Sequence, residues 1–163
     1  MTLSEEQRQK YNKFVSGVSL TSIRLGSCSV ESEPIRPSPS KTKVELEFET
    51  SLTEATFQTD AGEFDAVAQI AVKFSVRETG DPVGTIRASY RLTYTGQDSS
   101  DLDTVRLFVK QNVPVNAWPY LREFVHTTMQ RMDWPPFILP PMRRGPTKKK
   151  TAASKKAAAP TSD

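Results

Sequence analysis

Residues 112–141, NVPVNAWPYLREFVHTTMQRMDWPPFILPP, decide the fold of this chain. Proline is tolerated in the first turn of a helix, so we expect a helix to begin at Pro119. The residues after it recur at helical spacing and predict one buried face, formed by Leu121, Phe124, Val125, Thr128 and Met132. Residues 134–141 then hold four prolines among Trp, Phe, Ile and Leu, which excludes a helix or a central strand while requiring cover. We therefore predict a buried helix followed by an extended segment that lies against an apolar surface.

Upstream, the hydrophobic pattern has a period of two and predicts four strands. Residues 20–30 alternate with a change of phase near Gly26, which indicates a bulge, and residues 33–42 hold three prolines and predict an extended crossover. Val44, Leu46 and Phe48 alternate with Glu45, Glu47 and Glu49, while residues 66–76 and 86–94 alternate across a turn at residues 80–82. The pattern predicts an antiparallel sheet with one polar face.

Helical signals lie on both sides of the strands. Ser4 and Gln7 approximate a capping box for a short N-terminal helix that Gly17 would end, and Asp101 opens a helix after the strands. This order predicts an α+β fold: a four-stranded antiparallel sheet covered on one face by two C-terminal helices, plus the short N-terminal helix. We divide the chain into a helical extension (1–18), a central domain (19–142) and a disordered basic tail (143–163).

Composition limits the classes of function. At 163 residues and 36% hydrophobic, the chain has a thin core for an isolated globule, and oligomerisation would relieve this. One cysteine, Cys28, and one histidine, His126, exclude a disulfide framework and argue against a metal centre. The sequence has no run of eighteen apolar residues and no signal peptide at its N-terminus, so we expect a cytoplasmic protein without membrane insertion.

The positive charge is concentrated in the tail. Residues 143–163 carry seven Lys/Arg and one Asp, a net of +6 against +3 for the whole chain, so residues 1–142 carry −3. Such a tail could bind nucleic acid, an anionic lipid or an acidic partner, or could serve only for solubility. Because it has no aromatic residue to stack on bases, we regard nucleic acid as the weaker partner.

No catalytic constellation is found. The sequence lacks a nucleophile elbow and a glycine-rich phosphate loop, and its seven glycines are scattered. Alternating glutamates such as Glu45 and Glu47 are usually a solvated strand face. We predict neither an enzyme nor a bound cofactor or metal, and we expect recognition of extended, apolar polypeptide instead.

The C-terminal stretch resembles the helix and tail of the SecB family of bacterial export chaperones. The resemblance is carried by about a dozen positions in register: Pro114, Asn116, Pro119, Tyr120, Arg122, Glu123, Val125, Arg131, Trp134, Pro135, Leu139 and Pro140. A weaker likeness covers residues 20–96, so that about three quarters of the chain is included. The resemblance implies an antiparallel sheet with two covering helices and a homotetramer built as a dimer of dimers.

It also implies a function and two sites. The function is that of an ATP-independent holdase for unfolded preproteins in export, with a SecB-like chaperone dedicated to an antitoxin as an alternative. The Lys-rich tail, rather than the resemblance, gives a further alternative, a nucleic-acid-associated accessory protein. The implied client groove comprises Pro34, Ile35, Pro37, Trp118, Tyr120, Phe124, Trp134, Phe137 and Leu139. Phe124 and Leu139 have the stronger claim to a core role, whereas Trp118 and Trp134 suit either role. The translocase motor SecA would dock on acidic residues, here Glu31, Glu45, Glu47 and Glu49, although Ser27, Arg87 and Arg91 depart from the acidic pattern.

Overall fold

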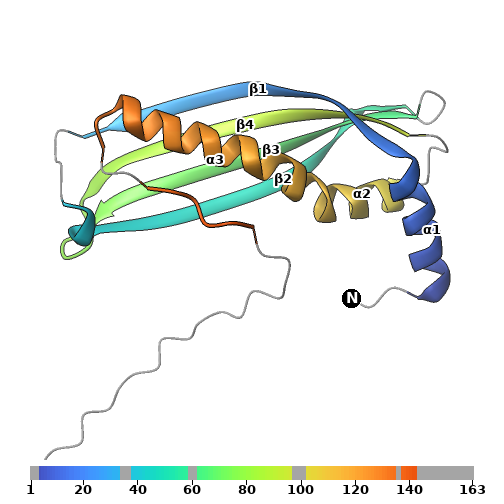
Figure 1. Cartoon of the computed structure of the whole chain (residues 1–163), viewed down its shortest axis with the longest axis horizontal. Coiled ribbons are helices and arrows are strands. Elements are labelled where there is room, and N and C mark those ends of the chain that lie inside the picture. The colour runs from blue at the N-terminus through green and yellow to red at the C-terminus, as the bar shows by residue number, and fades with distance from the viewer. Residues whose placement is uncertain (1–3, 34–37, 59–61, 97–101, 135–136, 143–163) are drawn as a thin grey trace, which may run out of the picture.

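A computed structural model describes residues 4–33, 38–58, 62–96, 102–134 and 137–142. The elements in chain order are α1 (Glu5–Gly17), β1 (Val18–Ser32), a 3-10 turn (Pro39–Lys41), β2 (Thr42–Gln58), β3 (Glu63–Val76), β4 (Pro82–Gly96), α2 (Leu102–Gln111) and α3 (Val113–Arg131). The strands form one antiparallel sheet in the order β1-β4-β3-β2, and α2 and α3 lie on one face of it (Figure 1). The predicted α+β architecture is confirmed. The basic tail lies outside the described residues.

The connection between β1 and β2 is a true crossover, because these two strands form opposite edges of the sheet. Its end is not extended as the prolines had suggested. Residues 39–41 form a 3-10 turn, in which the Lys41 amide donates to the Ser38 carbonyl oxygen at 2.9 Å and the Thr42 hydroxyl donates to the same oxygen at 3.1 Å. These local hydrogen bonds satisfy backbone groups that an extended path would leave to water.

The sheet separates apolar from polar side chains as the alternation predicted. In β3 the buried positions alternate from Phe64 to Phe74 and face the helices. The bulge expected near Gly26 lies between Leu25 and Ser27, and a second, unpredicted bulge lies between Leu20 and Ser22. Both bulges are in β1, where each inserts one residue and restores the apolar phase toward the helices.

The helix predicted to begin at Pro119 begins six residues earlier, so that expectation was wrong. Pro114 occupies the first turn, and Pro119 lies inside α3. The reason is a buried line at four-residue spacing that starts before Pro119 and outweighs one lost backbone hydrogen bond: Val113, Ala117, Leu121, Val125 and Met129. Met129 rather than Met132 therefore completes the inward face.

α1 packs into the same core. Its capping box forms as predicted, with the Gln7 amide donating to the Ser4 hydroxyl at 3.2 Å, and the helix ends at Gly17. Phe14 contacts Phe108 edge-on at 5.7 Å and Phe64 at 6.3 Å between ring centroids. The helix predicted as an extension thus closes one end of the sheet with aromatic contacts. Among the described helices, none is both long and apolar enough to cross a membrane.

Candidate functional site

The residues predicted to line the client groove fall into three groups. Pro34, Ile35 and Pro37 lie outside the described residues. Trp118, Trp134 and Leu139 are buried, with exposed fractions of 8%, 9% and 1%, and Phe124 and Phe137 are partly buried against the core. Only Tyr120 is well exposed, at 47%. Leu139 therefore has the core role that the sequence favoured for it. The groove as a whole stays a prediction.

The extended segment of residues 137–142 is held on the sheet by its own side chains and by Trp118. The Trp118 indole N–H donates to the Pro140 carbonyl oxygen at 2.9 Å, and the Trp118 ring meets Phe48 of β2 edge-on at 5.3 Å. Figure 1 shows this segment returning from the end of α3 along the β2 side. It covers apolar surface that α3 leaves free, which explains why a proline-rich segment is so apolar.

Trp134, which precedes this segment in the chain, packs against a glycine. Its ring lies edge-on to Phe74 at 5.1 Å, and it contacts Gly84 of β4 so closely that a β-carbon at Gly84 would collide with the ring and with the Glu31 carbonyl oxygen. A glycine is thus required near the start of β4 because a large side chain crosses its backbone.

The largest exposed apolar row lies on β1. Leu20, Leu25 and Val30 point to the face that carries the helices, since they pair with Tyr94, Tyr90 and Ile86 of β4, yet each is more than a third exposed. The row continues to α3 through Tyr90, whose ring lies 6.1 Å from that of Tyr120. We call Leu20, Leu25, Val30 and Tyr120 the β1–α3 surface. It is a part of the helix-bearing face that neither α3 nor residues 137–142 cover.

Tyr90 beneath this surface is uncharged at neutral pH. Burial raises the pKa of its phenol above the ordinary value, and the carboxylate of Glu123 raises it further. A neutral phenol lets the ring pack beneath the apolar row without a buried charge.

A hollow of about 500 Å³ lies between α3 and the extended segment of residues 137–142. Trp118 and His126 line it on one side, and Ile138 and Met142 on the other. Within the described residues, the buried Nδ1 atom of His126 has no hydrogen-bond partner. Of the described residues predicted for the groove, Trp118 lines this hollow.

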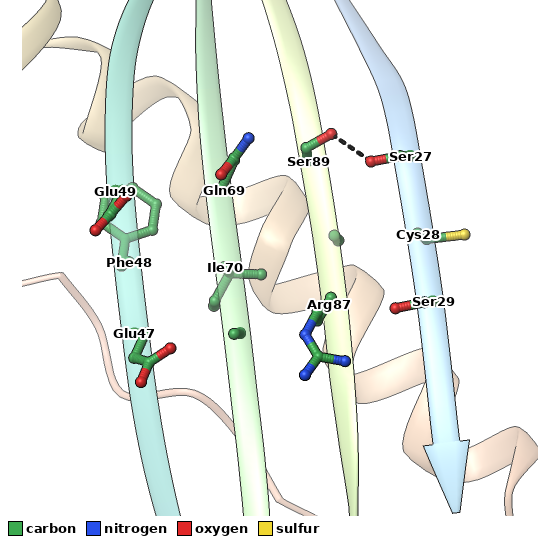
Figure 2. Close-up of a pocket in the computed structure, with 12 residues that line it drawn as sticks. Ser27, Cys28, Ser29, Glu47, Phe48, Glu49, Gln69, Ile70, Arg87 and Ser89 are labelled. Atoms are coloured by element: carbon green, nitrogen blue, oxygen red, sulfur yellow. Dashed lines mark hydrogen bonds between the residues drawn. The ribbon is translucent and has the colours of Figure 1, made fainter.

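The opposite face of the sheet is polar and holds a hollow of about 670 Å³ (Figure 2). Its floor has small side chains, among them Ser27 and Ser89, whose hydroxyl oxygens lie 2.8 Å apart. Charges on this face are separated: β1 and β4 contribute three arginines and one glutamate (Arg24, Arg87, Arg91 and Glu31), whereas β2 and β3 contribute five carboxylates and two lysines (Glu45, Glu47, Glu49, Glu63, Asp65, Lys43 and Lys73).

Three of the four acidic residues predicted for docking are already in ion pairs. Glu31 pairs with Arg87 at 2.9 Å, Glu47 with Lys73 at 2.7 Å, and Glu45 with Lys43 at 2.6 Å. The hydrogen bond and charge of Lys43 lower the pKa of the Glu45 carboxyl. Among the described residues only Glu49 of the four has no ion pair. These pairs reduce the negative charge that a basic partner would meet.

No grouping of three or more His, Cys, Asp and Glu side chains able to hold a metal ion is found in the described part of the chain. Cys28 is exposed on β1 and free. The described residues do offer an apolar row on one face, a charge-separated polar face, and two strand edges.

Of the comparisons with known proteins, the one with solved structures bears on the fold. The chain matches no family model and no curated protein sequence. Among solved structures it is similar to a SecB-like chaperone from Mycobacterium tuberculosis, in complex with a ChAD peptide from the HigA1 antitoxin, with 17% identity, a TM-score of 0.71, and coverage of 80% of this chain and 94% of that chain. A protein of unknown function from Streptococcus agalactiae matches at 12% identity and a TM-score of 0.44, over 76% of this chain and 96% of that one. The first match shows that this chain has a SecB-like fold.

Two features of the site escaped the sequence analysis. The alternation in β1 indicated Leu25 and Val30 as apolar, but nothing local shows that the helices leave them uncovered. The basic side chains of α2 that overhang β2, Arg106 and Lys110, occupy ordinary solvent-facing positions of an amphipathic helix, so the sequence carries no signal for them.

Proposed function

We propose that this protein is an ATP-independent holdase that binds unfolded or partly folded polypeptides in the cytoplasm. The observation that carries the proposal is the β1–α3 surface, an apolar row left uncovered on a SecB-like fold. An unfolded client presents irregular apolar side chains, and a row of leucine, valine and tyrosine can bind many of them without a fixed shape. Binding and release need no nucleotide, because the affinity comes from apolar area alone.

The size of this surface suits reversible binding. Complete burial of a leucine or valine side chain contributes about 1.5–3 kcal/mol. Leu25 is 46% exposed, so covering it contributes about 1 kcal/mol. Four such residues therefore supply several kcal/mol, from which the ordering of the client must be subtracted. We expect weak binding of any one segment and tighter binding where a long client contacts several surfaces.

For the client we favour a segment of an antitoxin over exported preproteins. The similar solved chaperone is bound to a peptide from an antitoxin, which supports an antitoxin-like client here. Docking of the motor SecA, which an export role would use, is disfavoured because Glu31, Glu45 and Glu47 are already in ion pairs. Export remains the alternative, and co-purification with SecA at physiological salt would support it.

We also propose a homo-oligomer, assembled through the free edge of β1. This edge is long, and a second copy could pair with it through backbone hydrogen bonds, which would leave the apolar row beside it open to a client. Pairing of two β1 strands gives a dimer, and the tetramer expected from the SecB resemblance requires a second contact. Multi-angle light scattering on the purified chain distinguishes the monomer, dimer and tetramer by mass.

The function is tested by light scattering from reduced α-lactalbumin, with and without the protein and without ATP. We expect the intact chain and a chain truncated after Met142 to suppress aggregation equally. Tyr120→Ser should weaken suppression about tenfold, which corresponds to about 1.4 kcal/mol. The matched control is Leu46→Ser, because Leu46 is 41% exposed but lies on β2. Equal suppression by both variants, at an unchanged oligomeric mass, would refute the assignment of the β1–α3 surface.

A further inference from the structure

A third hollow, of about 500 Å³, lies where α2 overhangs β2. From β2 it is lined by four consecutive residues, 49–52, and from α2 by Arg106, Val109 and Lys110. Successive side chains of a strand point to opposite faces, so four consecutive residues can line one hollow only at the edge of the strand. The hollow therefore opens onto the backbone of β2.

This edge has unused hydrogen-bonding capacity. β2 pairs with β3 alone and forms one edge of the sheet. Within the described residues no backbone hydrogen bond joins the outer edge of residues 49–52 to another segment. Alternate N–H and C=O groups therefore face outward, as in sheets that accept an added strand.

The side chains around the hollow indicate what could be added. Arg106 and Lys110 lie one turn apart on the exposed side of α2, and the buried Val109 lies between them beside the partly buried Leu52. Lys110 has no ion pair among the described residues, and Arg106 pairs with Asp103 at 3.8 Å. Side chains of an added strand that face α2 would thus meet two cations and an apolar patch.

We propose that an extended polypeptide segment adds to residues 49–52 of β2 as a fifth strand, with acidic and apolar side chains alternating on the side that faces α2. This proposal rests on the proposed function, since it assigns a backbone-binding site to a client chain. The protein's own residues 143–163 are a poor occupant, because their seven Lys/Arg would lie beside Arg106 and Lys110.

The test uses a nine-residue peptide in which valine and glutamate alternate on one face and serine and lysine on the other. Two further peptides carry N-methyl groups on the odd or on the even backbone amides. In an added strand only alternate amides face β2. We therefore expect one N-methylated peptide to bind at least tenfold more weakly than the parent, measured by calorimetry, and the other to bind within threefold of it. Equal binding of the two would overturn the proposal.

The cations are tested by Arg106→Glu with Lys110→Glu, matched by Arg131→Glu at the far end of α3. We expect the double variant to lose parent-peptide binding at least tenfold and the control to keep it, with both variants unchanged in far-ultraviolet circular dichroism. Equal binding by the double variant and the wild-type chain would overturn the predicted acidic face. Truncation after Met142 should not increase binding, and a marked increase would mean that the basic tail is the occupant instead.

The two proposals fail separately. If the intact chain suppresses aggregation of α-lactalbumin but does not discriminate between the N-methylated peptides, the edge site is wrong and the holdase stands. If the intact chain does not suppress aggregation, the holdase fails, and discrimination between the peptides would then identify β2 as a site for a dedicated peptide only.

Discussion

The sharpest test of the packing concerns two neighbouring residues of the extended C-terminal segment. Leu139 is 1% exposed and Ile138 is 57% exposed, although both are aliphatic and adjacent in the sequence. Removal of three buried carbon atoms in Leu139→Ala forfeits about 2.4 kcal/mol of transfer free energy at about 0.8 kcal/mol per carbon. The cavity adds to this, but an extended segment with exposed neighbours can partly collapse onto the hole. We expect the free energy of unfolding to fall by about 2–3 kcal/mol.

Ile138→Ala is the control, and its free energy of unfolding should stay within about 0.5 kcal/mol of wild type. Both variants are measured by urea denaturation at one protein concentration, because oligomerisation makes apparent stability depend on concentration. Tryptophan fluorescence reports Trp118, which is hydrogen-bonded to Pro140, and circular dichroism reports the whole fold. If Leu139→Ala costs less than about 0.5 kcal/mol by both probes, the segment is not part of the folded core and our account of its burial is wrong.

Three further predictions concern the close glycine, the aromatic cluster and alkaline pH. Gly84→Ala should lower the free energy of unfolding by more than Gly80→Ala, because a β-carbon at Gly84 collides with Trp134. A β-carbon at Gly80 meets open space, so that only the positive φ of 80° costs about 1 kcal/mol. A larger loss of stability in Gly80→Ala, measured by urea denaturation, would contradict this. Phe14→Ala removes the ring contacts that hold α1, so hydrogen exchange of the α1 amides should increase while the β3 amides keep their protection. Equal exchange in both elements would instead mean that α1 and the sheet unfold together. Burial raises the pKa of Tyr94 above its ordinary value of about 10, so the unfolded state loses this proton first and stability should fall as pH rises above 10. Tyr94→Phe should reduce the decrease of unfolding free energy with pH, and an unchanged decrease between pH 9 and 11 would refute the assignment.

The fold was largely predictable because β3 and β4 each bury one face. Alternation in residues 66–76 and 86–94 has a simple physical cause, the core beneath the sheet. It indicated both where the strands lie and which side chains face the core. The start of α3 was not predictable from Pro119. The proline rule describes one residue, whereas the line from Val113 to Met129 is a property of the whole helix and its packing.

The site was less predictable than the fold because exposure of an apolar residue depends on what covers it. Leu25 and Ile70 occur in similar alternating patterns, yet Ile70 is buried under the helix layer and Leu25 lies beyond it. The partnership of Trp134 with Gly84 joins residues fifty positions apart, and neither carries a local signal of the other. Sequence patterns identify side chains that need cover, and only the tertiary arrangement shows which of them lack it.

The two free edges of the sheet differ in ways that suit them to different partners. Beside β1 lies an apolar row without a helix above it, which the irregular apolar side chains of a client could cover while the edge of the strand pairs with a second copy. Beside residues 49–52 of β2, α2 leaves a hollow of about 500 Å³ with two cations, next to backbone groups that suit a single extended chain. If both assignments hold, pairing at β1 would leave the β2 edges at the two ends of the doubled sheet. One long client could then reach both ends, and its affinity would rise through effective concentration without a new kind of contact.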